Sequence, residues 1–418
     1  MRSEGAPADL LTSIPPMRVD GMTPAEFVQP GTPRDVADIL AAAGADGRAV
    51  IPFGGGTKLS LGNVPERADI GLSTLGLNRV LHFEPTDLTL SVESGMRFAD
   101  LQAVLAEQGK TLPLDAVDAE RATIGGLVAS ALSGPRRLGN GTLRDLLIGV
   151  AVAYPNGTVA KAGGLVVKNV TGFDLMRLHH GALGTLGVMV ALNFKVMPLP
   201  RSESTVIAEF ASFAEGMAAS DRVRASRVRP AALDLVDAGD SWRVAVRLGG
   251  RETTVKLLAG EVRDLMADAR TLETAESSDW WQAHVSGTGA VEADSAHLRC
   301  GGNPSTAALT GERILRVLHA HDISYRHFSI EPLNGITNVR FGLVKGHPRG
   351  SAATRLRALQ IDLLAVADHV TVVSAPTPWK RGIDVWGRVP ETIDVMRALK
   401  AEFDPGRTIN PGRYVDGI

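Results

Sequence analysis

AVIPFGGGTK, residues 49–58, joins a short apolar strand directly to three consecutive glycines. Glycine allows positive φ angles and lets a ligand approach the main chain closely. The loop therefore presents backbone N–H groups without side-chain obstruction, and Thr57 and Lys58 add a hydroxyl and an ammonium. These donors together suit a diphosphate. For the loop taken alone, a plain glycine turn between two strands is the alternative.

The loop matches neither of the two common phosphate-binding motifs. It lacks the Gly-x-x-x-x-Gly-Lys-Ser/Thr spacing of the nucleotide hydrolases. It also lacks the third spaced glycine and the following helix of the Rossmann fingerprint. The loop alone therefore does not identify a cofactor site.

Two further glycine segments follow, and 21 of the 45 glycines lie within residues 52–200. TIGGLVAS, residues 123–130, predicts an apolar helix that either aims free N–H groups at an anion or packs tightly against a strand. GALGTLG, residues 181–187, enters a predicted strand. This glycine density indicates a turn-rich β domain, a domain folded around a cofactor, or both.

Local patterns predict strands and helices through the first half of the chain. A capped helix is expected over 33–44, because Thr32 precedes a proline and Asp35 stands three residues after the cap. The Asn156-Gly157 pair predicts a type I′ hairpin turn between strands at 145–154 and 159–162. The remaining elements are expected as strands at 49–53, 88–92 and 187–197 and a helix at 98–109.

The pattern changes after Pro198 and Pro200, where glycines become fewer and strands alternate with helices. Examples are predicted strands at 242–248 and 338–344 and a helix at 304–319, an order that predicts a sheet with covering helices. The last helix is expected over about 390–403. We expect four parts, with boundaries at residues 1–26, 27–200, 201–376 and 377–418.

Composition excludes several classes of function. Forty-four basic and forty-six acidic side chains leave a net charge of −2, so no overall field attracts nucleic acid. No apolar run is long enough to span a membrane, and the first twenty residues lack the apolar core of a signal peptide. Cys300 is the single cysteine, which excludes an internal disulfide and a cysteine-held metal cluster. We expect a cytoplasmic protein that partners could bring to a membrane surface.

The order of the glycine segments resembles that of one family, the FAD-binding oxidoreductases of the vanillyl-alcohol oxidase type. Successive motifs of that family match the glycine loop, EPTDLT (84–89), TIGG (123–126), GTLRD (141–145) and GALGTLGV (181–188). Within the family, the chain is similar to the E-type flavin subunits of bacterial glycolate oxidases. That likeness is carried by GPRR (134–137), KNVTGFDL (168–175) and INPGR (409–413). The resemblance as a whole covers about residues 28–200, the expected flavin domain, and 377–418, the C-terminal segment.

The resemblance implies an α+β fold. A PCMH-type FAD-binding domain of two α/β subdomains would be followed by a smaller α/β cap domain for the substrate. A C-terminal segment would then return to the flavin. Some relatives hold flavin covalently through a histidine near the first loop or a cysteine near the second. Neither residue type occurs in 51–63 or 115–140, so we expect non-covalent FAD.

The resemblance also implies which residues contact the cofactor. The FAD diphosphate would be lined by Gly54, Gly55, Gly56, Thr57 and Lys58. The diphosphate and ribityl chain would be approached by Thr123, Gly125 and Gly126. The adenine would lie near Gly187 and Val188, and the flavin ring near Asn410.

The implied activity is oxidation of a small 2-hydroxy acid. We expect an FAD-carrying subunit of a glycolate oxidase or a related 2-hydroxy-acid dehydrogenase complex. A paralogous flavin subunit and an iron–sulfur subunit that takes the electrons would be its partners. Two alternatives stay open: a stand-alone FAD-dependent dehydrogenase of glycolate or D-lactate, and a flavin-fold subunit that serves assembly only.

The sequence assigns no catalytic residue and no metal site. Several catalytic relatives carry an H-G-D-G-N-x-H metal motif in the substrate domain, which this chain lacks. His319, His321 and His327 are expected at a helix end, in a loop and in a strand, as surface or core residues rather than ligands. The roles of other candidates stay open: His179 and His180, the Trp280-Trp281 pair as core or interface, and Arg340, Arg381 and Arg388 as carboxylate ligands.

Overall fold

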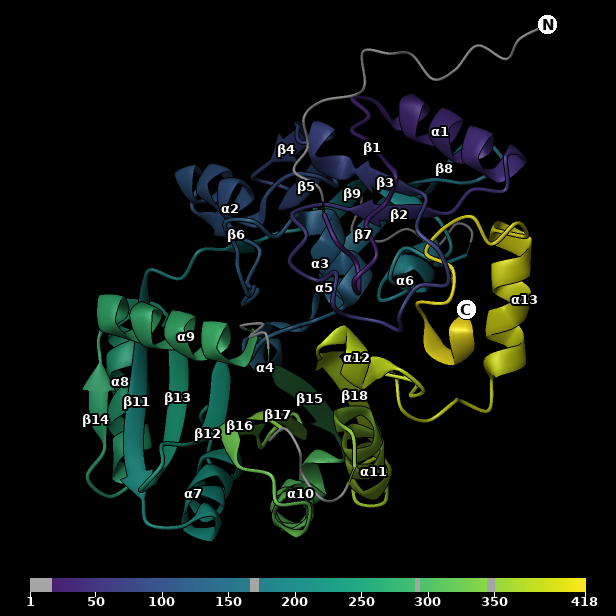
Figure 1. Ribbon diagram of the computed structural model, residues 1–418. Coiled ribbons are helices and arrows are strands. Elements are labelled where there is room, and N and C mark those ends of the chain that lie inside the picture. The colour runs from purple at the N-terminus through teal and green to yellow at the C-terminus, as the bar shows by residue number, and fades with distance from the viewer. Residues whose placement is uncertain (1–16, 166–172, 290–293, 344–349) are drawn as a thin grey trace, which may run out of the picture.

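The computed structural model describes residues 17–165, 173–289, 294–343 and 350–418. Figure 1 shows two halves, with the N-terminal half above and a large sheet with its helices below. The C-terminal segment runs along one side of both halves. The first five residues of the KNVTGFDL segment lie outside the described residues.

In the described ranges, three sheets form the N-terminal half. Their strand orders are β1-β3-β2, which is parallel, β4-β5-β9-β7-β8, which is antiparallel, and the pair β10-β6. The strands are β1 Glu26–Val28, β2 Val50–Phe53, β3 Ile70–Ser73, β4 Val80–Glu84, β5 Thr89–Glu93, β6 Lys110–Thr111, β7 Leu147–Ala153, β8 Val159–Gly163, β9 Val188–Lys195 and β10 Met197–Pro198.

Helices pack on these sheets through apolar faces. The predicted capped helix is α1, Pro33–Ala45, and the capping box between Thr32 and Asp35 is present. Its Leu40 is fully buried in a cluster that joins the parallel sheet to β9. The other helices of this half are η2 Thr74–Gly76, α2 Phe98–Glu107, α3 Ile124–Ser130, α4 Arg137–Asn140, α5 Leu143–Leu146 and α6 Leu175–His179.

The β7–β8 hairpin is present, but its predicted type I′ turn is wrong. Type I′ needs positive φ at both central residues, and here only Gly157 has one, at 80°. The Gly157 amide donates to Tyr154 O at 3.0 Å, and the Tyr154 amide donates to Thr158 O at 3.0 Å. Pro155 fixes φ near −65°, so the chain adopts a three-residue loop that ends on a left-handed glycine.

An eight-stranded antiparallel sheet forms the second half, beginning two residues after Pro200. Its order is β14-β11-β13-β12-β16-β17-β15-β18. The strands are β11 Ser202–Phe210, β12 Ala232–Asp237, β13 Trp242–Gly250, β14 Arg270–Leu272, β15 Ser295–Gly301, β16 Tyr325–Glu331, β17 Ile336–Gly342 and β18 His369–Ser374. Its helices are α7 Phe213–Ala225, α8 Glu252–Asp264, α9 Thr274–Gly289, η3 Pro304–Thr306, α10 Ala307–Ala320 and α11 Ala352–Leu364.

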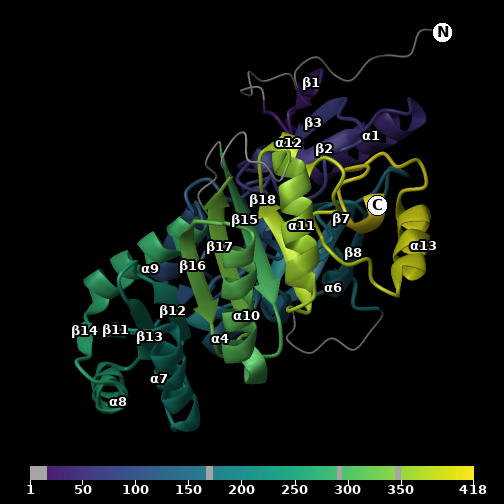
Figure 2. The same cartoon turned by 60° about the horizontal axis from the view of Figure 1, so that its bottom comes forward.

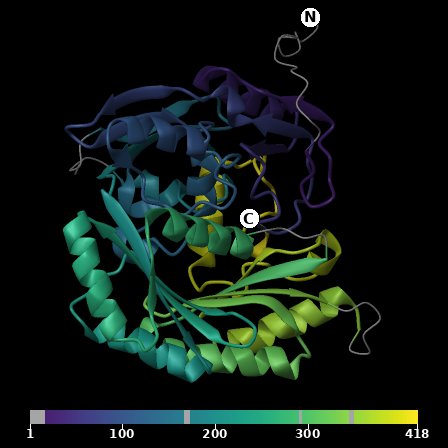
Figure 3. The same ribbon diagram turned by 90° about the vertical axis from the view of Figure 1, so that its left-hand side faces the viewer.

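The two faces of this sheet differ in chemistry. Side chains alternate across a strand, so Leu298 and Cys300 of β15 enter the apolar core while His297 and Arg299 lie on the opposite face. Helices α7, α8, α10 and α11 cover the apolar face, as Figure 2 shows. Figure 3 shows the other face turned toward the N-terminal half, with α9 between the two.

The C-terminal segment returns to the first half. It contains α12 Thr377–Lys380, α13 Ile393–Phe403 and η4 Val415–Gly417, so the last long helix begins three residues later than predicted. Ile409 then forms a parallel bridge with Val50 of β2. The mixed fold class with two α/β parts and a returning segment is therefore confirmed.

Candidate functional site

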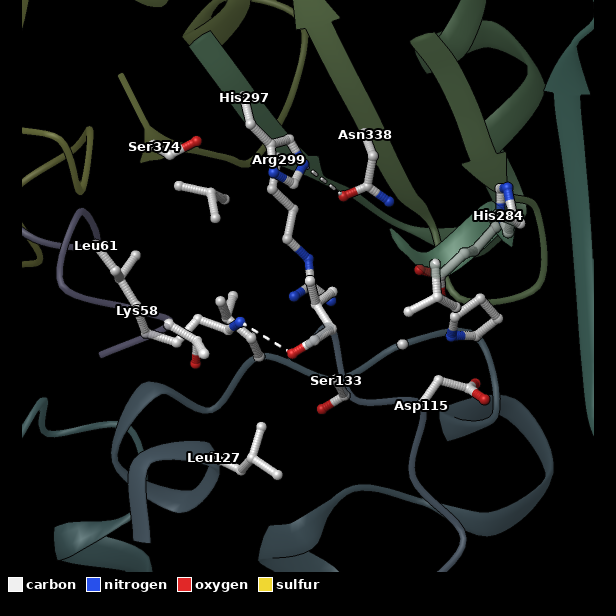
Figure 4. A pocket seen from close by; sticks show the side chains of 18 of the residues that line it. Lys58, Leu61, Asp115, Leu127, Ser133, His284, His297, Arg299, Asn338 and Ser374 are labelled. Carbon is white, nitrogen blue, oxygen red and sulfur yellow. Dashed lines mark hydrogen bonds between the residues drawn. The ribbon is translucent and has the colours of Figure 1, made fainter. Parts of the chain in front are cut away.

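A pocket lies between the polar face of the eight-stranded sheet and loops of the N-terminal half (Figure 4). About 800 Å³ of space lies between its lining residues, and this space includes open solvent. Thr57 and Lys58 of the glycine loop line one side, and Ser133 follows α3. The sheet supplies the opposite wall. The pocket therefore joins the predicted cofactor loop to the second half of the chain.

Strand register brings the polar residues of the sheet together. Arg299 of β15 stands directly opposite Asn338 of β17, and His297 of β15 stands opposite Ser374 of β18. All four line the pocket. Because residues two apart share a face of a strand, His297 and Arg299 project in the same direction.

Arg299 places a cation in the middle of the pocket. Figure 4 shows its side chain extending from β15 toward the loop of Ser133. Its guanidinium donates no hydrogen bond to any residue of the described ranges, and burial lowers its pKa from the usual value while Glu331 opposes that change. Arginine stays protonated under such a shift. An anion is the ligand that such a guanidinium would bind.

Lys58 is the second cation facing this pocket. Burial lowers the pKa of its ammonium to about 8, opposed by Asp118. The ammonium reaches only the carbonyl of Val117, at 3.5 Å. Among the described residues, no carboxylate forms an ion pair with Lys58, so this side of the pocket also favours an anionic ligand.

His297 is held by a neighbouring amide. Its Nε2 lies 3.2 Å from Asn338 Oδ1, and because an amide oxygen only accepts, Nε2 carries the proton. Burial, with Arg299 and Arg340 nearby, lowers the pKa of His297 to about 3, opposed by the Asn338 hydrogen bond. The imidazole is therefore neutral and keeps its Nδ1 lone pair.

Acidic groups occupy the far side of the pocket. His284 Nε2 of α9 lies 2.7 Å from Asp234 Oδ2 of β12. Burial raises the pKa of Asp234 well above its usual value, with Asp115 adding to the effect. Burial, together with Asp234, also raises the pKa of Glu331 to about 7. Burial therefore favours the protonated form of both acids on this wall.

The glycine loop has the donors that a diphosphate needs. The amides of Gly55, Gly56 and Thr57 donate to no acceptor in the parts of the chain that the structure describes. A Cβ on Gly54 would lie 2.0 Å from Thr123 Oγ1, and one on Gly55 would lie 1.6 Å from the Arg121 carbonyl oxygen. The first glycine segment thus packs against the second, and with Lys58 it fits a dinucleotide phosphate.

The N-terminus of α3 does not offer free donors. The amides of Ile124, Gly125 and Gly126 donate to Met96 O, Ser94 O and Thr123 Oγ1. A Cβ on Gly125 would lie 2.7 Å from Ser94 Cβ. Of the two interpretations left open for this segment, tight packing is therefore the one present, because the segment after β5 and Thr123 accept these hydrogen bonds. Contact between Thr123, Gly125 or Gly126 and the cofactor stays a prediction.

The remaining predicted cofactor residues lie away from this pocket. Gly187 is so closely packed that a Cβ added to it would lie 2.5 Å from Val152 Cγ1. Val188 is buried at the start of β9. Asn410 donates from Nδ2 to Leu183 O at 2.7 Å. Its buried Oδ1 finds no partner among the described residues and so keeps an acceptor. Their approach to adenine and flavin stays a prediction.

The histidines noted in the sequence occupy the expected elements. His319 ends α10, His321 lies 2.7 Å from Asp362, and His327 lies on β16 within 3.1 Å of Ser329 Oγ. His179 is buried, and its Nε2 lies 2.9 Å from the Tyr154 hydroxyl. Within the described ranges, no three His, Cys, Asp or Glu side chains lie close enough to hold a metal ion.

The aromatic pair and the arginines noted in the sequence take structural positions. Trp281 is buried and donates from Nε1 to Thr205 Oγ1 at 2.8 Å, while Trp280 stacks on His284. Arg340 donates to Gly287 O, and Arg388 donates to Leu364 O. Neither these arginines nor Arg381 line the pocket.

Sequence reasoning missed the residues of the polar sheet face. They are Asp234, His284, His297, Arg299, Glu331 and Asn338. The available signal was alternation: polar and apolar residues alternate in SAHLRCG, residues 295–301. Alternation marks a two-faced strand, but it does not show that the polar face meets a second domain.

Comparison with protein families identifies both halves of the chain. Residues 24–163 match the family described as FAD binding domain. Residues 199–272 and 387–414 match the family of FAD linked oxidases, C-terminal domain. The chain thus combines the two domains of FAD-linked oxidases, and FAD is its cofactor.

Several curated proteins are similar to this chain. Glycolate oxidase subunit GlcE of Escherichia coli is 34% identical over 44% of this chain and 52% of its own length. Glycolate oxidase subunit GlcD of Bacillus subtilis is 28% identical over 51% of this chain and 46% of its own length. These alignments span about half of each relative. D-2-hydroxyglutarate dehydrogenase of Xanthomonas citri pv. viticola is 26% identical over 94% of this chain and 89% of its length.

A solved structure agrees on the fold. Alkyldihydroxyacetonephosphate synthase superposes with a TM-score of 0.68 over 94% of this chain and 77% of its own, at 18% identity. No helix in the described ranges is both long and apolar enough to cross a membrane.

Proposed function

We propose that this chain, an FAD-binding protein of the FAD-linked oxidase type, oxidises a small 2-hydroxy acid as the flavin subunit of a dehydrogenase complex. One observation carries the proposal. The pocket beside the glycine loop also contains Arg299, whose guanidinium has no protein acceptor in the described ranges. A cofactor loop and a carboxylate-binding group therefore meet at one place.

The residues of the pocket suit such a substrate. FAD, when bound, supplies a two-electron acceptor. Arg299 would bind the carboxylate of the acid through paired N–H donors, the geometry in which arginine is most selective. Leu61, Leu127 and Leu132 give the pocket apolar walls that exclude water and strengthen this contact.

Membership in a complex is supported by the names of two relatives. Two similar proteins are named as glycolate oxidase subunits. The only cysteine, Cys300, is buried in the apolar core of the sheet, and burial raises the pKa of its thiol to about 12. An iron–sulfur centre that takes electrons would have to lie on another chain. A paralogous flavin subunit would complete the complex.

The test compares the isolated chain with the native complex. The chain is purified with its flavin counted, then assayed with an artificial electron acceptor and glycolate, D-lactate or D-2-hydroxyglutarate. We expect weak turnover alone and strong turnover in a complex that contains iron. Full turnover by the isolated chain would identify a stand-alone dehydrogenase instead.

The flavin itself tests the alternative of an assembly subunit. A chain that only supports assembly would purify without the visible flavin spectrum, even after incubation with FAD. Acid precipitation tests the mode of attachment. We expect the flavin to stay in the supernatant, and a yellow pellet would contradict non-covalent binding.

A further inference from the structure

We infer that Asp20 is a positioning residue for FAD binding, because its carboxylate holds in place the loop that follows the three glycines. Docking of the hairpin that carries Asp20 and binding of FAD would then favour each other. We call residues 17–22 the N-terminal hairpin and residues 57–63 the pocket loop. The inference concerns the cofactor and does not depend on the substrate proposed above.

The N-terminal hairpin is a tight turn that places one carboxylate inside the protein. Val19 and Met22 form an antiparallel bridge and exchange two hydrogen bonds, each at 2.9 Å. Asp20 and Gly21 between them have φ angles of 46° and 81°, and a type I′ turn needs such positive values at both positions. The side chain of Asp20 is only 2% exposed. The turn therefore buries a negative charge.

Two buried cations of the C-terminal segment face this carboxylate. Lys380 Nζ of α12 lies 2.6 Å from Asp20 Oδ1, and the Lys380 side chain is fully buried. Burial lowers the pKa of Arg413 to about 10, and Asp20 opposes that change. Among the residues that the structure describes, Asp20 is the only carboxylate that forms an ion pair with Lys380. Asp20 thus supplies the negative charge that both cations need when they are buried.

The two cations bind three successive carbonyls of the pocket loop. Lys380 Nζ donates to Ser60 O at 3.0 Å. Arg413 Nη2 donates to Leu59 O at 2.6 Å and also to Leu61 O. Hydrogen bonds from charged donors are stronger than those between neutral groups. Because three consecutive peptide groups are held, the path of the pocket loop depends on these cations.

The pocket loop carries side chains that enter the candidate site. Thr57, Lys58, Ser60 and Leu61 all line the pocket. Figure 4 shows Lys58 and Leu61 on one side of it. A change in the path of this loop would therefore move the ammonium of Lys58, which faces the predicted diphosphate site.

The N-terminal hairpin also touches the glycines themselves. A Cβ added to Gly56 would lie 2.2 Å from Met17 Cε and 3.0 Å from Met17 Sδ, so the two residues are in contact. Gly56 is one of the glycines whose amides are available to a phosphate. The hairpin therefore supports the cofactor loop at two points, through Met17 directly and through Asp20 by way of the cations. Such coupling is reciprocal, so FAD must also stabilise the docked hairpin.

The first experiment tests this reciprocity in the wild-type protein. Hydrogen exchange of the Val19 and Met22 amides is followed with and without FAD, because their hydrogen bonds exist only while the hairpin is formed. Helix α8, on the far face of the large sheet, is the internal reference. We expect FAD to slow exchange at Val19 and Met22 about 5- to 150-fold. Slowing no greater than that of the α8 amides would overturn the inference.

The second experiment removes the charge and keeps the turn. Asp20→Asn suits this purpose, because Asn-Gly also favours a type I′ turn. At pH 7 we expect the variant to bind FAD about 5- to 150-fold more weakly, and FAD no longer to slow exchange at Val19 and Met22. Asp268→Asn is the matched control, because Asp268 is an exposed aspartate with a positive φ of 53°. We expect it to bind FAD as the wild type does.

A third variant covers the case in which Asp20→Asn does not fold, since it leaves buried cations without their partner. Met17→Ala removes the contact with Gly56 and leaves all three charges in place. We expect it to bind FAD about 3- to 10-fold more weakly.

Two results of the variants would overturn the inference. One is FAD affinity in Asp20→Asn within about threefold of the wild type. The other is tighter binding of FAD by Asp20→Asn or Met17→Ala, because the hairpin would then oppose the cofactor. Both measurements use FAD without substrate, so either result leaves the proposed oxidation of a 2-hydroxy acid standing.

Discussion

At Lys58, burial makes the charge of one ammonium depend on pH near neutrality. The pKa of this group is lowered to about 8 in the free protein. A bound diphosphate would raise it again, because the opposite charge favours the protonated form. Below about pH 8 the lysine is already charged, so FAD binding takes up no proton. Above that pH, binding must restore the proton.

We therefore predict that FAD affinity is constant below about pH 8 and falls by up to about tenfold per pH unit above it. Equilibrium titration of apoprotein with FAD across pH measures this. Lys58→Met should bind FAD more weakly and without this pH dependence, while the exposed Lys161→Met should match the wild type. A pH-dependent profile in Lys58→Met would contradict the assignment.

Gly55 tests the packing of the same loop. A Cβ at this position would lie 1.6 Å from the Arg121 carbonyl oxygen, and a backbone oxygen cannot move aside without moving the chain. We predict that Gly55→Ala lowers the free energy of unfolding by about 1–3 kcal/mol and releases FAD. Urea unfolding and flavin counting measure the two effects.

The control for Gly55 is Gly260 in α8, where an added Cβ meets nothing within 4 Å. Gly260→Ala should raise the free energy of unfolding by about 1 kcal/mol, because alanine favours a helix interior. If both substitutions change the free energy of unfolding equally, the close contact with Arg121 does not cause the loss of stability.

Among the elements, α13 holds the C-terminal segment against the first half through one buried lysine. Lys400 Nζ donates to Thr185 O at 2.7 Å, to Ile409 O at 2.9 Å and to Asp404 Oδ2 at 2.6 Å. Asp404 in turn accepts from the amides of Thr408 and Ile409. This network directs the chain into its bridge with β2.

We predict that Lys400→Met lowers the free energy of unfolding by about 3–5 kcal/mol, because it leaves a buried carboxylate and two carbonyls without their donor. Chemical unfolding measures this cost. Lys256→Met, which removes an exposed ion pair with Glu252, should leave stability unchanged. A Lys400 variant as stable as the Lys256 variant would contradict the role of the network.

Individual helices and turns show how much of the fold could be predicted from the sequence. The capping box of Thr32 and Asp35 predicted α1 correctly because its signal is local. The hairpin at Asn156-Gly157 was correctly predicted as a hairpin, but Pro155 changed its turn type. At Gly125 the sequence left free amides and tight packing as alternatives, because the acceptor of the Gly125 amide, Ser94 O, lies thirty-one residues earlier in the chain. Such a partner leaves no local pattern.

Of the residues that line the pocket, the sequence pointed only to Thr57 and Lys58, because they end a run of three glycines. Their contact with the cofactor stays a prediction. Arg299 and Asn338 were missed because they become neighbours through the pairing of β15 with β17, which follows from the complete sheet order. The sequence shows two-faced strands, but the order of eight strands decides which residues share a pocket.

For the whole molecule, a group of four charges joins the two halves next to the pocket. Asp115 accepts from Arg136 Nε at 3.1 Å and from Arg247 Nη1 at 3.0 Å. Glu203 accepts from Arg136 at 2.8 Å and from Arg247 at 2.6 Å. Asp115 and Arg136 belong to the first half, and Glu203 and Arg247 to the sheet. Each arginine therefore bridges both halves.

We predict that Arg247→Met weakens this junction, because two largely buried carboxylates then share one arginine. The free energy of unfolding should fall by about 3–5 kcal/mol, and FAD should dissociate faster because the pocket lies between the halves. Urea unfolding and the rate of flavin release measure this. Arg227→Met, at an exposed pair with Glu261, is the control and should change neither.

The most direct test of the account is anaerobic reduction of bound flavin by D-lactate or glycolate, in wild type and Arg299→Met at equal flavin content. If the cofactor loop and Arg299 serve one pocket, the visible flavin absorbance of the wild type bleaches, and the variant bleaches only at much higher acid concentration. Equal concentration dependence in the two proteins would contradict the account. So would a fully flavinated wild type that no 2-hydroxy acid reduces, alone or in its native complex.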